Sequence, residues 1–199
     1  MKKWILIALG ALVALAGIAY LVGARLPRDH VASVRAHFDQ PPDSIYRVLT
    51  DVAAYPGWRH EVKAIEILPD RNGHQLWRER AGSAVLDYEF TLAVRPNRLV
   101  STIVSTDVGF SSRWIYQILP DAGGTMLTIT EEGAVDDPIF RFLLRFVVGV
   151  HGTLEKFLLA LGTRFGTTVR PERVTERVTE RVTERVTERV TERVTERVT

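Results

Sequence analysis

The sequence predicts an α+β domain in which a curved, seven-stranded antiparallel sheet holds a long C-terminal helix. Residues 61–133 contain six short apolar runs, separated by turn-forming segments rich in Gly, Pro, Asn and Asp. One further strand and two short helices come before these runs. After them, residues 139–165 carry apolar residues at helical spacing, which indicates one amphipathic helix.

The first element is a long apolar segment, Trp4–Gly23, which holds twenty residues without a charge. About 20 apolar residues at about 1.5 Å rise each span a hydrocarbon core roughly 30 Å thick. This segment predicts a single transmembrane anchor. The alternative is a cleaved signal peptide, since Ala14-Leu15-Ala16 fits the small-x-small cleavage pattern. Signal peptides, however, have shorter apolar regions of about 7–15 residues.

The charges beside this segment favour one orientation weakly. Lys2 and Lys3 precede it, and Arg25 and Arg28 follow it. Counting the free amine as well, the positive-inside rule mildly favours a cytoplasmic N-terminus. We therefore expect a single-pass membrane protein whose folded domain is extracytoplasmic, or periplasmic in a bacterium.

The folded part begins with a strand and two short helices. Residues 30–38 alternate small and apolar side chains, as a strand does. Pro42 and Asp43 suit a helix start, and a second, very short helix covers residues 52–55. The strand at residues 61–68 follows the Pro56-Gly57 turn.

Five more strands are expected, each bounded by turn residues. They cover residues 74–80, 84–94, 98–106, 110–119 and 125–133. Because the separating segments have the length of hairpin loops, the sheet is expected to be an antiparallel meander.

The last helix is predicted to be long, with Gly149 and Gly152 in its middle, where they allow close packing against strands or a slight kink, or leave space for a ligand. Asp137 suits the N-cap and Pro138 the first helical position. Apolar residues then recur every three or four positions as far as Phe165, over roughly 40 Å of helix. Such a helix is long enough to cross the whole sheet.

The C-terminal segment repeats the unit Glu-Arg-Val-Thr to residue 199. A four-residue unit is too short for a solenoid, whose repeats have roughly 20–50 residues. We expect a solvated tail, disordered or weakly helical, without a site; the alternative is a charged docking arm. The expected organisation is therefore an anchor and linker at 1–28, a folded domain at 29–169 and a tail at 170–199.

Composition excludes several function classes. The net charge is +2 and there is no basic block, so nucleic acid is not an expected partner. There is no cysteine, which excludes disulfides and thiolate chemistry. The five histidines lack metal-site spacing, and neither a nucleophile elbow nor a phosphate-binding loop occurs. No metal or cofactor is expected.

Alternation along the strands and the apolar face of the last helix predict which residues line a ligand pocket. Inward-facing aromatic and apolar side chains with a few hydroxyl groups suit a pocket that binds a hydrophobic molecule. The alternative is that the same side chains fill a packed core. The candidates are Trp58, Tyr88, Phe90, Phe110, Ser112, Trp114, Tyr116, Leu127, Ile129, Phe146 and Val150.

Evidence for catalysis is weaker. His60 and Glu131 form the one plausible acid–base pair, provided that the fold brings them together. Arginines expected in strands could recognise a ligand carboxylate or phosphate, although such side chains more often face water. They are Arg78, Arg80 and Arg113. We assign no catalytic residue from the sequence.

Three stretches together resemble the START-like, or SRPBCC, superfamily, also described as polyketide cyclase/dehydrase-like or Bet v 1-like. They are "PPDSIYRVLTDVAAYPGW", "RHEVKAIEIL" and "DDPIFRFLLRFVVGVHGTLEKFLLALGTRFG". The resemblance covers residues 31–166 and implies the helix-grip fold, with a hydrophobic cavity between the sheet and the last helix. It also implies that Trp58 lies near the cavity mouth.

What the resemblance implies about function is broader, because this fold carries many activities. The leading expectation is a membrane-anchored domain that binds a hydrophobic small molecule such as a lipid, a polyketide or a quinone-like compound. One alternative is a cyclase or dehydratase that uses the same cavity. Another is a packed interaction module without a ligand.

Overall fold

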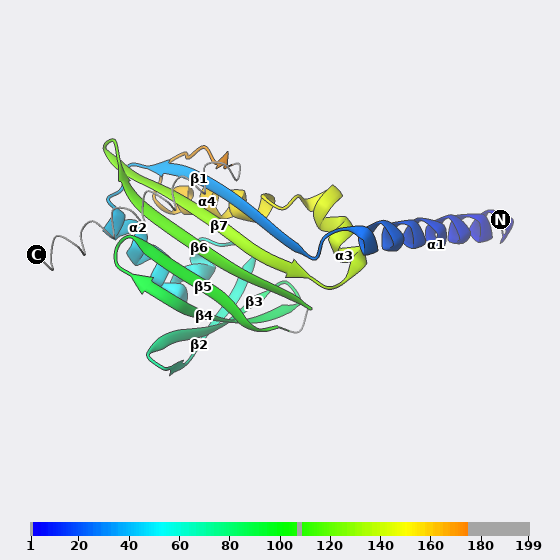
Figure 1. Cartoon of the computed structure of the whole chain (residues 1–199), viewed down its shortest axis with the longest axis horizontal. Coiled ribbons are helices and arrows are strands. Elements are labelled where there is room, and N and C mark those ends of the chain that lie inside the picture. Colours follow the sequence, from blue (N-terminus) through cyan, green and yellow to red (C-terminus); the bar gives the residue numbers. More distant parts are fainter. Residues whose placement is uncertain (1, 107–108, 175–199) are drawn as a thin grey trace, which may run out of the picture.

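The computed structural model describes residues 2–106 and 109–174 (Figure 1). A long helix, α1 (Lys2–Arg25), projects from one end of the domain. The next elements, in chain order, are β1 (Asp29–Phe38), α2 (Pro42–Thr50) and the 3₁₀ helix η1 (Val52–Gly57). Six strands follow: β2 (Val62–Arg71), β3 (His74–Ala81), β4 (Ala84–Val94), β5 (Arg98–Thr106), β6 (Phe110–Asp121) and β7 (Gly124–Val135).

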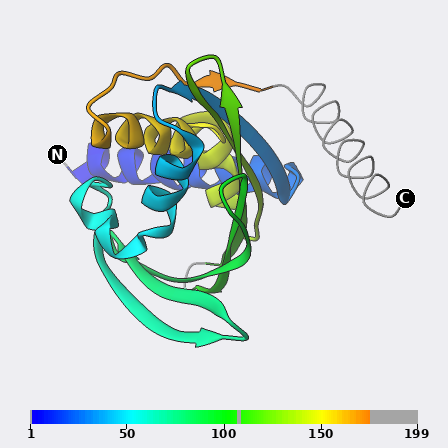
Figure 2. The ribbon, with the colours of Figure 1, turned by 90° about the vertical axis from the view of Figure 1, so that its left-hand side faces the viewer.

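These strands form one antiparallel sheet in the order β2-β3-β4-β5-β6-β7-β1-β8. Sequence neighbours pair from β2 to β7, and β1 joins the far side of β7. Figure 2 shows the sheet curving around the helices. The predicted α+β class and antiparallel meander are therefore confirmed, with one extra short strand, β8 (Glu172–Arg173).

The hydrophobic core lies between the sheet, α2 and the last helix. Ile45 and Leu49 of α2 are fully buried, one helical turn apart. They pack in a cluster with the inward residues of β1 and β7, such as Val34 and Ile129. This packing fixes the short helices against one end of the sheet.

The predicted long C-terminal helix is wrong in one respect, because it is broken. Its first part is α3 (Pro138–Leu143), followed by a π-helical turn, η2 (Leu144–Val148), and only then by α4 (Gly152–Arg164). The Gly149 N–H donates to the Leu144 carbonyl at 2.9 Å, which closes the π turn. Gly149 has a φ of 77°, which glycine adopts readily and other residues do not. Helical spacing of the apolar residues continues through this break, so periodicity did not reveal it; the two glycines predicted at most a slight kink.

The folded part also extends beyond the expected boundary at residue 169. Val169 is buried, and β8 pairs with β1 through the first Glu-Arg unit of the repeat. The Val174 N–H donates to the Ser33 carbonyl at 2.9 Å, and Arg173 Nε donates to Glu155 Oε1 at 2.6 Å. The first repeat unit therefore covers the edge of β1. The expected solvated tail lies, from residue 175 on, outside the described residues.

Helix α1 is joined to the domain by close contacts at its C-terminal end. A Cβ atom on Gly23 would lie 1.8 Å from the Pro138 carbonyl oxygen, so only glycine permits this approach. Arg141 Nη1 donates to the Leu26 carbonyl at 2.8 Å, and Arg28 forms an ion pair with Asp136. Over Lys3–Arg25, α1 is the one helix of the described chain long and apolar enough to cross a membrane.

Candidate functional site

A cavity of about 260 Å³ lies between the inner face of the sheet, η1 and the segment that joins α3 to α4. Its walls are mostly aromatic and aliphatic, and they carry several hydroxyl and charged groups. Six of the residues predicted from the sequence line it: Tyr88, Phe110, Ser112, Trp114, Tyr116 and Val150. Strands β4 and β6 and the turn before α4 thus bring the larger part of the predicted set together.

The other five predicted residues do not line the cavity. Phe90, Leu127 and Ile129 are buried in the core, and Phe146 is exposed on η2. Trp58 packs edge-on against Tyr55 and Phe157, with ring centroids 5.3 Å and 5.4 Å away. Trp58 therefore packs as a core anchor, and it is not among the residues that line the cavity.

Aromatic rings in mutual contact support the cavity wall. The Trp77 and Tyr88 rings stack across β3 and β4, with centroids 5.3 Å apart and planes 9° apart. Trp114 meets Phe157 of α4 edge-on at 5.4 Å. Each such pair adds about 0.5–1.5 kcal/mol beyond simple burial, so these walls are held in fixed positions.

A buried ion pair interrupts the apolar wall. Arg59, just after η1, binds Glu79 of β3 through two parallel hydrogen bonds of 3.0 Å and 3.1 Å. Glu79 is only 2% exposed. The Arg59 guanidinium also lies over the Tyr55 ring at 5.0 Å and the Phe157 ring at 5.4 Å. Arg59 Nε also donates a hydrogen bond of 2.8 Å to Glu61 Oε1, so the guanidinium is held from several sides.

Burial determines the protonation of the polar groups in this wall. It raises the pKa of the Glu79 carboxyl, and the Arg59 guanidinium opposes that rise. Burial also raises the pKa of Tyr116 to about 12 and that of Tyr88 above its ordinary value. Both phenols therefore stay protonated at neutral pH and are able to donate a hydrogen bond to an oxygen atom in the cavity.

Besides Glu79 and Glu61, Glu131 of β7 also lines the cavity, and it accepts a 2.7 Å hydrogen bond from Ser112 Oγ. His60, its suggested acid–base partner, is exposed and does not line the cavity. The histidine that does line the cavity is His30, on the neighbouring strand β1. The pairing of His60 with Glu131 is therefore wrong.

The strand arginines do not reach the cavity. Arg78 binds Asp87 at 2.7 Å and Arg113 pairs with Glu132, both between neighbouring strands. Arg80 is exposed. The arginine of the cavity is Arg59, which lies in an aperiodic loop where alternation gives no information.

Alternation could have identified the two acids. Glu79 stands two residues after Trp77 in β3, and Glu131 two residues after Ile129 in β7. Residues two apart on a strand share a face. The next residue on the inward face of each strand is therefore a glutamate, so both carboxylates are expected to point inward.

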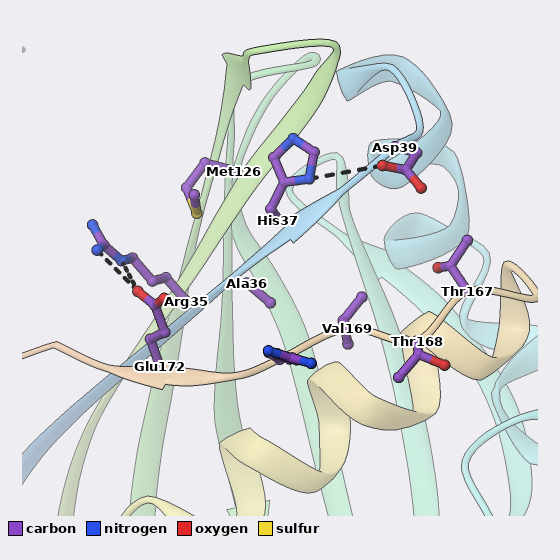
Figure 3. Close-up of a pocket in the computed structure, with 10 residues that line it drawn as sticks. Arg35, Ala36, His37, Asp39, Met126, Thr167, Thr168, Val169 and Glu172 are labelled. Carbon is purple, nitrogen blue, oxygen red and sulfur yellow. Dashed lines mark hydrogen bonds and ion pairs between the residues drawn. The ribbon is translucent and has the colours of Figure 1, made fainter.

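A second, more polar pocket of about 270 Å³ lies where β1 meets residues 167–172 (Figure 3). Arg35 and Glu172 close one side through an ion pair of 3.0 Å. His37 Nδ1 lies 3.9 Å from Asp39 Oδ1; Asp39 is exposed, whereas His37 is only partly exposed. This pocket lacks the aromatic walls and buried charges of the cavity, which is therefore the stronger candidate site.

Solved structures share this fold. A START superfamily protein from Mycobacterium smegmatis is 22% identical, with a TM-score of 0.56, and the match covers 68% of this chain and 96% of that one. A Thermus thermophilus protein is 20% identical with a TM-score of 0.59 and the same coverages. The Zhui aromatase/cyclase from a Streptomyces species is 17% identical with a TM-score of 0.52, over 67% of this chain and 88% of that one.

Sequence comparison gives the family. No curated protein matches the chain. The model of one family, described as polyketide cyclase / dehydrase and lipid transport, matches residues 29–166, which is more than half of the chain. The matched range starts at the first residue of β1 and ends just after α4. The chain therefore belongs to the polyketide cyclase / dehydrase and lipid transport family.

Proposed function

We propose that this protein is a membrane-anchored domain that binds a hydrophobic small molecule in the cavity between the sheet and the helices. The observation that carries the proposal is an aromatic cavity whose wall also holds a buried Arg59–Glu79 pair and two protonated phenols. Apolar walls with a few oriented polar groups are typical of ligand pockets.

The size of the cavity narrows the ligand class. Its volume of about 260 Å³ lies near the lower end of the range for ligand pockets, about 300–1,000 Å³. A compact ring system, such as a polyketide or a quinone-like head, fits this volume better than a whole two-chain lipid. Burying about 200 Å² of apolar ligand surface would contribute about 5 kcal/mol.

Helix α1 supports the membrane part of the proposal. Its length and composition suit a span, and its apolar side chains are exposed along its length. In the proposed topology the domain lies outside the cytoplasm, with Lys2 and Lys3 inside. A hydrophobic ligand partitions into the same bilayer, so anchoring keeps the cavity near its supply.

Ligand binding is tested by filling the cavity. Ile103 lines the cavity and its neighbour Val104 is exposed, so Ile103→Trp and Val104→Trp form a matched pair on β5. The full chain is purified in mild detergent and extracted with organic solvent, and small molecules are identified by mass spectrometry. We expect a near-stoichiometric apolar compound in the wild type and Val104→Trp, and at least a tenfold loss in Ile103→Trp.

The same experiment is able to contradict the proposal. Equal amounts of compound in both variants would show that the molecule is bound elsewhere, for example around α1. An empty wild-type extract, together with no binding of added aromatic probes, would favour a packed module without a ligand.

An enzyme is the second candidate, because His30 and Glu131 both line the cavity, and histidine and carboxylate side chains are groups that enzymes use as general acids and bases. Under this hypothesis Glu131→Gln keeps the shape and the Ser112 hydrogen bond but loses the base. A substrate should then accumulate in the Glu131→Gln extract and be converted when wild-type protein is added. An identical extract from both proteins would leave binding as the sole function of the cavity.

A further inference from the structure

The segment from α3 to η2 (Pro138–Val148), called here the α3–η2 segment, is unusually apolar for a protein surface. Its eleven residues hold two arginines, and every other residue is apolar, including three phenylalanines. None of the α3 residues is buried. The exposed fractions of Phe146 and Val147 are 60% and 70%, and Ile139 and Leu143 are also exposed. Exposed apolar patches of this kind indicate a binding surface.

The α3–η2 segment has two apolar faces. On one side, Phe140 and Leu144, four residues apart, line the cavity, and the Phe140 ring lies 6.2 Å from that of Phe110. Phe146 and Val147, by contrast, do not line the cavity and are mostly exposed. A single layer of apolar side chains therefore separates the cavity from whatever lies outside.

The position of this segment beside α1 indicates what lies outside. Gly23 of α1 touches Pro138, and the Leu26 carbonyl accepts a hydrogen bond from Arg141. Figure 1 shows α3 at the end of the domain from which α1 projects. The exposed apolar surface is thus continuous with the apolar surface of the candidate membrane span.

The charge pattern of the segment agrees with a lipid surface. Arg145 is exposed and has no acidic partner among the described residues. Helices that lie in a membrane interface combine arginine or lysine with phenylalanine and leucine, and they sink about 5–10 Å into the headgroup–acyl boundary. A long arginine side chain reaches from that depth to lipid phosphates.

We propose that the α3–η2 segment lies in the headgroup–acyl boundary of the bilayer that α1 enters, so that lipid covers the outer side of the cavity wall. This inference rests on the anchoring stated under the proposed function. It adds that the cavity faces the bilayer directly. Phe140 and Leu144 then separate the cavity from the lipid, and the π turn and Gly149 lie at the end of that wall.

The test uses single cysteines, which the cysteine-free chain allows without background. The full chain carries Val147→Cys, Ile67→Cys on the edge strand β2, or Leu12→Cys in α1. All three positions are more than half exposed, at 70%, 52% and 63%. Each variant receives a nitroxide label in vesicles of phosphatidylcholine and phosphatidylglycerol. Collision rates with oxygen, which concentrates in lipid, and with a water-soluble nickel chelate are then measured.

We expect the label at position 147 to resemble the one at position 12, with several-fold higher oxygen than nickel accessibility, and the label at 67 to show the reverse. If the label at position 147 has the accessibilities of the label at position 67, while the label at position 12 is in lipid, this inference is overturned and the anchor is retained. Water exposure at all three positions overturns the anchor itself. A label at 147 shielded from both reagents indicates a second copy or another protein on this surface, and also overturns the inference.

Discussion

Replacing Arg59 with methionine should lower the free energy of unfolding by about 3–5 kcal/mol at pH 8, because it leaves the Glu79 carboxylate buried without its partner. Glu79 is 2% exposed and receives two hydrogen bonds from Arg59. The measurement is urea unfolding of the full chain in detergent, followed by the fluorescence of the tryptophans in the domain.

The effect of this substitution should depend on pH. Burial already raises the pKa of Glu79 above its unfolded value, and removal of Arg59 raises it further. A group with a raised folded pKa contributes stability that is present below the unfolded pKa and lost as pH rises through the folded pKa. The variant should therefore lose stability relative to the wild type as pH rises through the raised pKa of Glu79 in the wild type, and the difference should be smallest in acid.

A half-exposed pair provides the control. Arg78 binds Asp87 with a similar geometry, but its side chain is 34% exposed. Arg78→Met should cost about 1 kcal/mol or less, as surface ion pairs do. The double variant Arg59→Met with Glu79→Leu should recover most of the lost stability, since no charge is left buried. Equal costs for the two single variants would show that burial of Glu79 does not matter.

Replacing Gly23 with valine should separate α1 from α3. The backbone oxygen of Pro138 would lie 1.8 Å from the new Cβ, and a carbonyl cannot move aside as a flexible side chain does. The two helices must therefore move apart by more than 1 Å, given ordinary van der Waals separations of about 3.5–4.0 Å. Measured by double electron–electron resonance between labels at Leu12→Cys and Ile67→Cys, the narrow distance distribution of the parent should become markedly broader.

Gly17→Val is the matched control on the same helix, because a Cβ at Gly17 meets nothing within 4 Å. Its distance distribution should remain as narrow as that of the parent. If Gly23→Val also keeps a narrow distribution, the contact between α1 and α3 does not hold the domain in place.

Most strands were predictable because turn chemistry marks their ends. Asn72 and Gly73, with φ values of 53° and 78°, form the two-residue turn between β2 and β3, as Asn-Gly pairs often do. The break in the last helix was not predictable from periodicity. The α3–η2 segment keeps the apolar spacing of a core helix although none of the α3 residues is buried and Phe146 and Val147 are mostly exposed.

The site was predictable only in part, for a related reason. Alternation tells which side chains point inward, but not whether they meet a neighbour or an open space. Tyr88 and Phe90 share one face of β4, yet Tyr88 lines the cavity and Phe90 packs at 4.5 Å against Trp77. The position of Arg59 in the cavity wall depends on contacts between segments distant in sequence, and a local sequence pattern does not predict such contacts.

The short segment that joins α1 to β1 is fixed by hydrogen bonds. Leu26 and Arg28 are held through their backbone carbonyls by Arg141 and by the Val135 N–H, and β1 starts at Asp29. If α1 lies in a bilayer, as proposed, the domain cannot move away from the membrane surface on a flexible linker. It travels by lateral diffusion and turns only about the membrane normal. Under the proposed anchoring, its encounters with another membrane protein then depend on the number of those proteins per unit area of membrane and not on a concentration in the surrounding solution.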